Sequence, residues 1–300
     1  MTPQIYQIFY LDYQKSSLEK DFIPYDNRAN PRPEWCEYFV FRENFNKGIC
    51  STGHPTGFIS WKFNQKTGLH GTDFHQFIRE NSGADVYFIN PFVDEAAFYQ
   101  NLWLQGERNH PGLIELSQHI FDRVGYKIDL KSLVMPFEKS LYCNYFVGNT
   151  KFWKSFMEFC EPIYDEIENN LDPESKKFLS QRADQTIKAD YRPFIFERLF
   201  STFLCLHPEI SSKSYANSPK ALELRYGKES ARFIGQLADL KNSSSLADYQ
   251  ALAARALAHP AYGPNASWLK KKFRKIIRLE MIKNPQLREA ARTLRQAFKR

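Results

Sequence analysis

Short apolar runs and helical patterns alternate along the first two thirds of the chain. Runs rich in β-branched and aromatic residues predict strands at 5–10, 58–61, 86–89 and 142–147. Apolar residues spaced by three and four predict helices at 37–45 and 73–81, two helices broken around 106–111, a long helix from Thr150, and a helix from near Pro193 that ends before Pro208. The alternation indicates an α/β layered domain.

After Pro208 the pattern becomes purely helical. Helices are predicted at 214–241 and 246–258, separated by the polar stretch 242–245, and 259–265 reads as a linker. We therefore divide the chain into a domain at 1–207, a helical extension with a linker at 208–267, and a basic tail at 268–300.

Composition narrows the class of protein. With 43% hydrophobic residues, 300 residues can bury a sizeable core. The five cysteines are odd in number and contain no C-x-x-C pair, which argues against a disulfide framework or a structural zinc site and favours the cytoplasm. The sequence contains neither a signal-peptide pattern nor a run of about 18 apolar residues, so we expect no membrane-spanning helix.

Common catalytic signatures are missing from the chain. It contains no P-loop, no G-x-G-x-x-G after the first strand, no G-x-S-x-G and no H-E-x-x-H. His70, Asp73 and His75 lie within six residues and could in principle hold a metal, but their spacing does not put all three on one helix face, which favours ordinary residues at the start of a helix.

Three polar stretches are candidates for chemistry. Glu197 and Arg198 interrupt a strongly apolar helix, where a carboxylate can act as a general base or form a structural pair with its neighbour. The proline-rich loop 24–35 is a ligand contact or a plain surface loop, and its polar residues are Asp26, Asn27, Asn30 and Arg32. Lys62 ends a core strand, where a positive charge is unexpected.

Six motifs follow one another as in a known family. They are "DN" at 26–27, "WCEYFVFREN" at 35–44, "GFISWKF" at 57–63, "ADVYFINPF" at 84–92, "YCNYFVGNTKFWKSFMEFCEPI" at 142–163 and "RPFIFERLFSTFL" at 192–204. Over residues 5–205 the chain resembles bacterial capsular and surface-polysaccharide glycosyltransferases. It departs from their pattern at Ser60 to Phe63, where the family has His-Tyr-Arg-Arg, and at Tyr38-Phe39, where it has Leu-Thr.

The resemblance implies an A-type glycosyltransferase with a single Rossmann-like sheet, flanking helices and a helical C-terminal extension. It implies catalytic roles for Glu197, Arg198 and Lys62. It also implies donor-binding roles for Asp26, Asn27, Glu37, Trp61, Asp85 and Asn144. We expect an inverting reaction with Glu197 as base.

The expected metal site is missing from the sequence. A-type enzymes usually hold a divalent metal such as Mg²⁺ or Mn²⁺ with Asp-x-Asp, and the chain contains no such motif. Lys62, with Lys66 or Arg198, could neutralise the leaving phosphate instead. Asp85 and Asp94 remain the candidate metal ligands.

The basic tail at 268–300 determines where in the cell we expect the protein to act. Residues 268–300 contain twelve Lys and Arg against two Glu, and Trp268, Leu269, Phe273, Ile276, Ile277 and Met281 can line one side of a helix. Such a helix can lie on an anionic membrane, be merely solvated, or bind nucleic acid. We expect a cytoplasmic enzyme at the inner face of the membrane that acts on a lipid-linked or growing glycan in capsule, lipopolysaccharide or exopolysaccharide synthesis. The alternatives are a non-catalytic subunit that binds a nucleotide sugar or carbohydrate, and a nucleic-acid-binding protein.

Overall fold

The structure is a computed structural model that describes residues 2–183, 189–243 and 246–258. The chain divides into two compact units, Met1–Leu246 and Ala247–Arg300. The described part of the second unit is helical and belongs to α12 (Leu246–Ala258). The basic tail expected at 268–300 lies outside the described residues.

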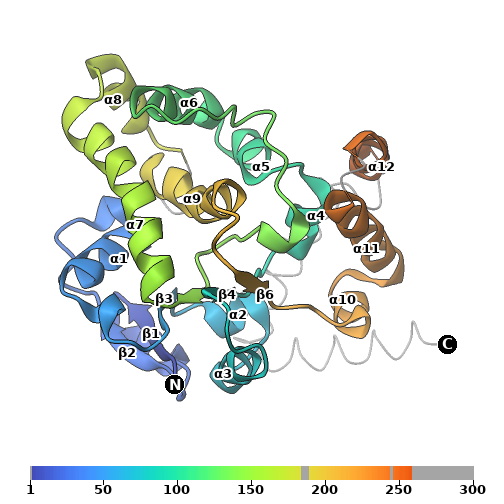
Figure 1. The fold of residues 1–300 in the computed structure, drawn as a ribbon, viewed down its shortest axis with the longest axis horizontal. Helices are drawn as coiled ribbons and strands as arrows, with labels where there is room; N and C mark the ends of the chain where they lie inside the picture. The colour runs from blue at the N-terminus through green and yellow to red at the C-terminus, as the bar shows by residue number, and fades with distance from the viewer. Residues whose placement is uncertain (1, 184–188, 244–245, 259–300) are drawn as a thin grey trace, which may run out of the picture. The chain divides into compact units, whose positions relative to one another are not determined.

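A six-stranded mixed sheet forms the centre of the first unit (Figure 1). Its strands are β1 (Gln4–Phe9), β2 (Ile23–Asp26), β3 (Thr56–Ser60), β4 (Val86–Phe88), β5 (Phe146–Gly148) and β6 (Ser212–Ser214). They lie in the order β2-β1-β3-β5-β4-β6. All pairings are parallel except those of β5, which runs antiparallel to both β3 and β4. The carboxyl ends of five strands therefore share one edge, which we call the carboxyl edge.

Alternate side chains of the central strands enter two separate cores. On β3, Phe58 packs in the larger core and Ile59 in the smaller one, and on β5 Phe146 and Val147 do the same. Helices α1 (Glu37–Asn46), α7 (Thr150–Asp165) and α9 (Arg192–Leu206) contribute to the larger core, whereas α3 (Gly71–Glu80) contributes to the smaller one. Because both faces are covered, the strands are apolar on both sides and read as continuous hydrophobic runs.

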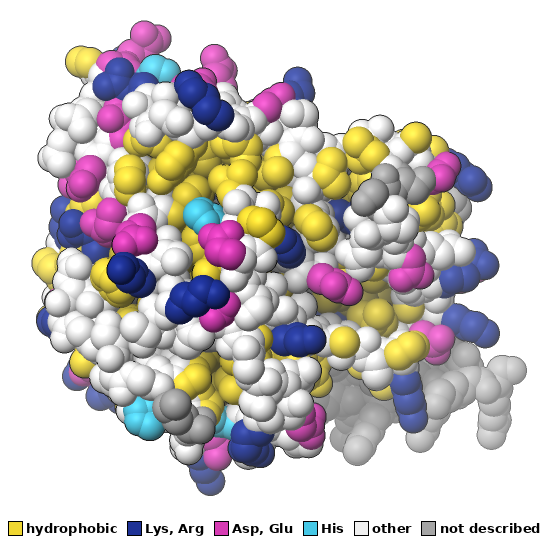
Figure 2. Space-filling view, in the orientation of Figure 1, with side chains coloured by type: hydrophobic (Ala, Val, Ile, Leu, Met, Phe, Trp, Pro, Cys, Tyr) yellow, Lys and Arg dark blue, Asp and Glu magenta, His cyan; other side chains and the backbone are white. Residues whose placement is uncertain are grey.

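The α-helices of the structure have the following bounds: α1 (Glu37–Asn46), α2 (Phe63–Thr67), α3 (Gly71–Glu80), α4 (Val93–Phe98), α5 (Leu102–Asn109), α6 (Leu113–Arg123), α7 (Thr150–Asp165), α8 (Pro173–Leu179), α9 (Arg192–Leu206), α10 (Pro219–Tyr226) and α11 (Lys228–Asn242). Of the described helices, none is long and apolar enough to cross a bilayer. On the face drawn in Figure 2, acidic and basic side chains are interspersed.

The prediction of an α/β domain is confirmed, but the helix α8 and three shorter elements were missed. The edge strand β2 contains Pro24 and is largely exposed, so it lacks the apolar alternation of a strand. The other edge strand, β6, is short and polar, and it extends the sheet beyond residue 207. The short helix α2 occupies the stretch after β3 that sequence reasoning left unassigned.

Three predicted elements differ in extent. The first of the two helices expected on either side of 106–111 is divided into α4 and α5, and α5 continues through Gly106 to Asn109. The strand expected from residue 142 begins only at Phe146, because Cys143 and Asn144 have positive φ angles of 70° and 54°. The helix expected over 214–241 is divided into α10 and α11 at Gly227, whose φ of 89° ends the first of them.

Candidate functional site

A cluster of two carboxylates and two ammonium groups lies at the carboxyl edge. Lys62 follows β3, Lys66 lies on α2, Glu37 begins α1, and Glu197 lies on α9. All four side chains are half-buried. The charges of Lys62, Lys66 and Glu197 each shift the pKa of Glu37. The fold thus brings together residues up to 160 positions apart, and we call this group the Glu37–Glu197 cluster.

Glu197 is held by two groups of different kinds. Its Oε1 atom accepts a 2.8 Å hydrogen bond from the backbone N–H of Cys143, and its Oε2 atom lies 3.6 Å from Nη1 of Arg198. The side chain remains 24% exposed. Glu197 therefore has a fixed orientation and one carboxylate oxygen that is not taken by a short hydrogen bond.

Glu37 lies in an environment that favours its neutral form. Burial raises the pKa of its carboxyl group, the neighbouring Glu197 raises it further, and its own backbone N–H, Lys66 and Lys62 oppose the shift. Two nearby carboxylates in different surroundings can hold different protonation states at the same pH. The fold therefore places two carboxyl groups in different surroundings beside each other.

The two lysines supply positive charge at the same place. The Lys62 ammonium lies 5.2 Å from the centre of the Trp61 ring, and the Lys66 ammonium donates a 2.9 Å hydrogen bond to the Cys143 sulfur. Burial alone would lower the pKa of Lys66, but the Cys143 sulfur, Tyr145 and Glu197 raise it overall. Lys66 is therefore charged at neutral pH.

Strained backbone surrounds the cluster. Cys36, Cys143 and Asn144 are the non-glycine residues with positive φ among those described, at 47°, 70° and 54°. Each costs on the order of 1–3 kcal/mol, and such residues concentrate at functional sites. Cys36 precedes Glu37, and Cys143 carries the N–H that holds Glu197, so the strain falls on the segments that orient both carboxylates.

Trp61 is the predicted donor-binding residue that adjoins Lys62 directly. Its ring is 8% exposed, it packs edge-on against the exposed Tyr13, and its Nε1 atom has no hydrogen-bond partner among the described residues. Asn144 lies nearby and lines a small cavity together with Glu37. Both residues therefore stay close to the cluster, as the resemblance implies.

Arg198 lies in the core, contrary to the expectation that it contacts a phosphate. Its side chain is 2% exposed and donates three hydrogen bonds, to the carbonyls of Leu102 and Phe194 and to Oε1 of Gln105, at 2.8, 2.6 and 2.9 Å. A Cβ atom on Gly106 would lie 2.4 Å from its Nε. Arg198 thus binds α5 to α9 and positions Glu197.

Asp26 is the last residue of β2 at the carboxyl edge, and Asn27 follows it. Among the described contacts, neither residue makes a hydrogen bond to the Glu37–Glu197 cluster. Both oxygens of Asp26 accept hydrogen bonds from Arg28, whose bonds lower the pKa of Asp26 to about 2. The backbone N–H of Asn27 donates to the Phe9 carbonyl at 2.8 Å. A donor contact by Asp26 would have to compete with Arg28.

The candidate metal ligands do not converge on a site. Asp94 is buried on α4, and its Oδ1 accepts a hydrogen bond from the Tyr226 hydroxyl. Asp73 caps α3 by accepting from the His70 backbone N–H, and His75 hydrogen-bonds the Asp21 carbonyl. Within the described ranges, no three His, Cys, Asp or Glu side chains are placed to hold a metal ion.

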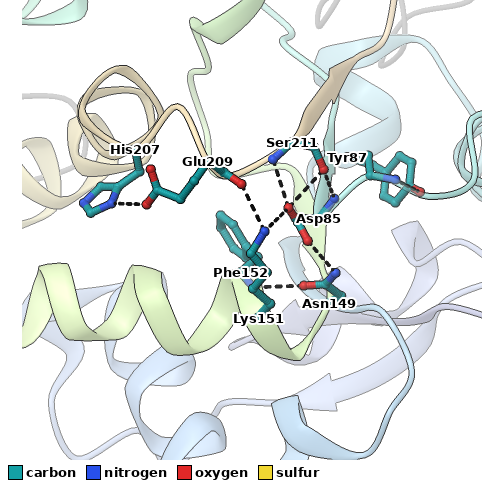
Figure 3. Close-up of polar contacts among 9 residues, drawn as sticks. Asp85, Tyr87, Asn149, Lys151, Phe152, His207, Glu209 and Ser211 are labelled. Carbon is teal, nitrogen blue, oxygen red and sulfur yellow. Dashed lines mark hydrogen bonds and ion pairs between the residues drawn. The ribbon is translucent and has the colours of Figure 1, made fainter.

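Asp85 lies at the opposite edge of the sheet and is fully engaged (Figure 3). It directly precedes β4, so it cannot contribute to a donor site at the carboxyl edge. Its Oδ1 accepts from Asn149, and its Oδ2 accepts from Lys151 and from both the N–H and the hydroxyl of Ser211, all within 3.0 Å. The contacts join the start of α7 to β4 and β6.

Replacing Asp85 with Asn is expected to lower the free energy of unfolding at pH 7 by about 2 kcal/mol. Although burial raises the pKa of this carboxyl, the hydrogen bonds from Lys151, Asn149 and Ser211 lower it to about 2. A lowered pKa stabilises the fold above the unfolded-state value, so the difference from wild type should vanish as the pH falls from about 4 to about 2. Urea unfolding across this range measures it, with the exposed Asp165→Asn as control; equal stability at pH 7 would contradict the structural role.

Sequence reasoning missed the part played by Cys143. Its backbone N–H fixes Glu197 and its sulfur contacts Lys66, yet in "YCNY" only Asn144 is of a residue type enriched in left-handed backbone, and the cysteine is not. Together the fold and cluster define an α/β protein with a polar, charged site at the carboxyl edge of a mixed sheet. No protein-family model, curated protein or solved structure matches the chain.

Proposed function

We propose that the protein is a glycosyltransferase that moves a sugar from a nucleotide-sugar donor to a hydroxyl group of a lipid-linked or growing glycan in bacterial surface-polysaccharide synthesis. The observation that carries this proposal is the Glu37–Glu197 cluster, with its two lysines, at the carboxyl edge. Open α/β sheets bind their ligands outside the carboxyl ends of the strands. The motif order over residues 5–205 supports the same activity and an A-type fold.

The reaction needs one base and neutralisation of the leaving group. The oxygen of the acceptor hydroxyl attacks the anomeric carbon, and its proton passes to Oε2 of Glu197. The bond from that carbon to the phosphate oxygen breaks, and its electron pair stays on the phosphate. Lys62 and Lys66 offset the new negative charge, and a single displacement inverts the anomeric centre.

The donor-side contacts come from the residues around this cluster. A protonated Glu37 can donate a hydrogen bond to a sugar hydroxyl, and the Asn144 amide can donate another. Trp61 is largely buried beside Lys62, so in this proposal it supports the lysine instead of stacking on the donor. These roles are part of the proposal.

A divalent metal is not built into this mechanism. Of the two candidate ligands, Asp85 lies at the opposite edge and Asp94 is occupied by Tyr226. Lys62 and Lys66 already lie beside the carboxyl groups of Glu37 and Glu197, where they would repel a metal ion. The described residues therefore do not fit a metal-bound diphosphate, and lysine supplies the charge.

Nucleoside diphosphates and their sugars are expected to raise the melting temperature, because a ligand that binds only the native state stabilises it. Lys62→Ala is expected to weaken this binding about tenfold, which corresponds to about 1.4 kcal/mol. EDTA should change neither binding nor sugar transfer. A thermal-shift screen followed by a transfer assay measures these effects, with the exposed Lys154→Ala as control; loss of activity in EDTA would contradict the lysine role.

The alternatives predict different outcomes in the same experiments. A non-catalytic subunit would bind the nucleotide sugar without transferring it. A nucleic-acid-binding protein would depend on the basic segment 268–300, which lies outside the described residues, as does the proposed membrane contact. The acceptor and membrane partners therefore rest on the sequence.

A further inference from the structure

Lys66 and Cys143 form a nitrogen–sulfur contact that the proposed reaction does not use. The ammonium nitrogen lies 2.9 Å from the sulfur, and both side chains are half-buried. Sulfur is larger than oxygen, so this separation is close for a hydrogen bond to a thiol. The nitrogen and sulfur atoms of a covalent bridge through one oxygen lie at a similar separation, so little movement is needed to form it.

The contact is held from both sides. Cys143 has a left-handed backbone with φ of 70°, and its N–H is bound to Glu197. Lys66 lies on α2, where its backbone N–H donates to the Lys62 carbonyl at 2.9 Å, and α2 ends at the left-handed Gly68. Neither atom needs a change of backbone to reach the other.

We propose that Lys66 and Cys143 are a covalent modification site at which oxidation joins the two side chains through a nitrogen–oxygen–sulfur bridge. The oxidant is dioxygen. One O₂ reacts with the ammonium and the thiol to give the bridge, one water and one proton. The N–O and O–S bonds form, the O–O bond breaks, nitrogen and sulfur lose two electrons each, and dioxygen gains four.

The surroundings of Cys143 and Lys66 determine how fast the bridge forms and how it changes the charge of the cluster. Burial raises the pKa of the Cys143 thiol to about 12, so the thiol is protonated at neutral pH and oxidises slowly compared with an exposed thiolate. The nearby Glu197 carboxylate can accept the released proton. In the bridge the nitrogen is neutral, so the Glu37–Glu197 cluster loses one positive charge until a reductant restores the thiol.

A second thiol at the same edge provides a control. Cys36 is also half-buried, but its sulfur contacts the Pro33 carbonyl at 3.7 Å. Cys36 also lies near the Glu37–Glu197 cluster, but its sulfur is hydrogen-bonded to a carbonyl oxygen and not to a lysine ammonium. Cys36→Ser should therefore leave the modification intact.

Intact-mass spectrometry of the full chain tests the modification without any substrate. After prolonged exposure to air at mildly alkaline pH, the wild type should gain about 14 Da, one oxygen gained and two hydrogens lost, and a thiol reductant should reverse the gain. Digestion should yield a cross-linked pair of peptides containing Lys66 and Cys143. Cys143→Ser and Lys66→Arg should lack the shift, while Cys36→Ser keeps it.

Each possible result of the mass measurement either supports the proposal or overturns it. An unchanged mass overturns the proposal, as does a gain of about 16 or 32 Da on Cys143 alone, which marks ordinary sulfur oxidation. A cross-link between other residues overturns it as well. Peptide mapping uses the wild type, so the result stands even where a variant folds poorly, and it does not depend on glycosyl transfer.

Discussion

Glu197→Gln is expected to lower the rate of sugar transfer by about 10²- to 10⁴-fold, the usual contribution of a positioned general base. Glutamine has nearly the same shape and can still accept the hydrogen bond from the Cys143 N–H, but it cannot take a proton from the acceptor hydroxyl. The variant should therefore keep the geometry of the site but lose the ability to deprotonate the acceptor hydroxyl. Turnover is measured with the donor found in the thermal-shift screen.

Two comparisons make this result specific. The exposed Glu158→Gln should leave turnover unchanged, because Glu158 lies on the outer face of α7. Donor binding by the Glu197 variant should stay within about threefold of wild type, since the phosphate contacts are assigned to lysines. Near-normal turnover in the Glu197 variant would remove this residue as the base and point to Glu37.

Arg198→Leu is expected to lower the free energy of unfolding by about 3 kcal/mol or more. The substitution leaves the carbonyls of Leu102 and Phe194 and the Gln105 side chain without this donor, the first in a buried place and the other two in half-buried ones. Each buried group that loses its partner costs about 1–3 kcal/mol. Urea unfolding measures the change.

A surface arginine provides the contrast. Arg28 makes hydrogen bonds to Asp26 and Asp12, but its side chain is 43% exposed. Its replacement by Leu should leave the free energy of unfolding close to that of the wild type, because exposed ion pairs contribute little. If Arg198→Leu kept wild-type stability and lost only transfer activity, Arg198 would act on the substrate rather than on the fold.

Prediction from the sequence succeeded where local pattern and burial agree. The apolar runs that became β1, β3 and β4 are buried on both faces, so their composition marks them regardless of partners. The edge strands β2 and β6 have polar or proline-containing sequences, and only their hydrogen bonds to β1 and β4 make them strands. Pairing across the sheet is a long-range property that a local window does not contain.

For the site, the sequence by itself determined which residue types are at hand: a carboxylate within an apolar helix, a lysine at the end of a core strand, and no Asp-x-Asp. Only the tertiary structure decided how they are used. The neighbours Glu197 and Arg198 face different surroundings, one toward the half-buried cluster and the other into the core, and Asp85 points to the far edge. The reason is physical: direction and burial of a side chain depend on packing between distant segments, whereas a sequence motif records only chemical type and spacing.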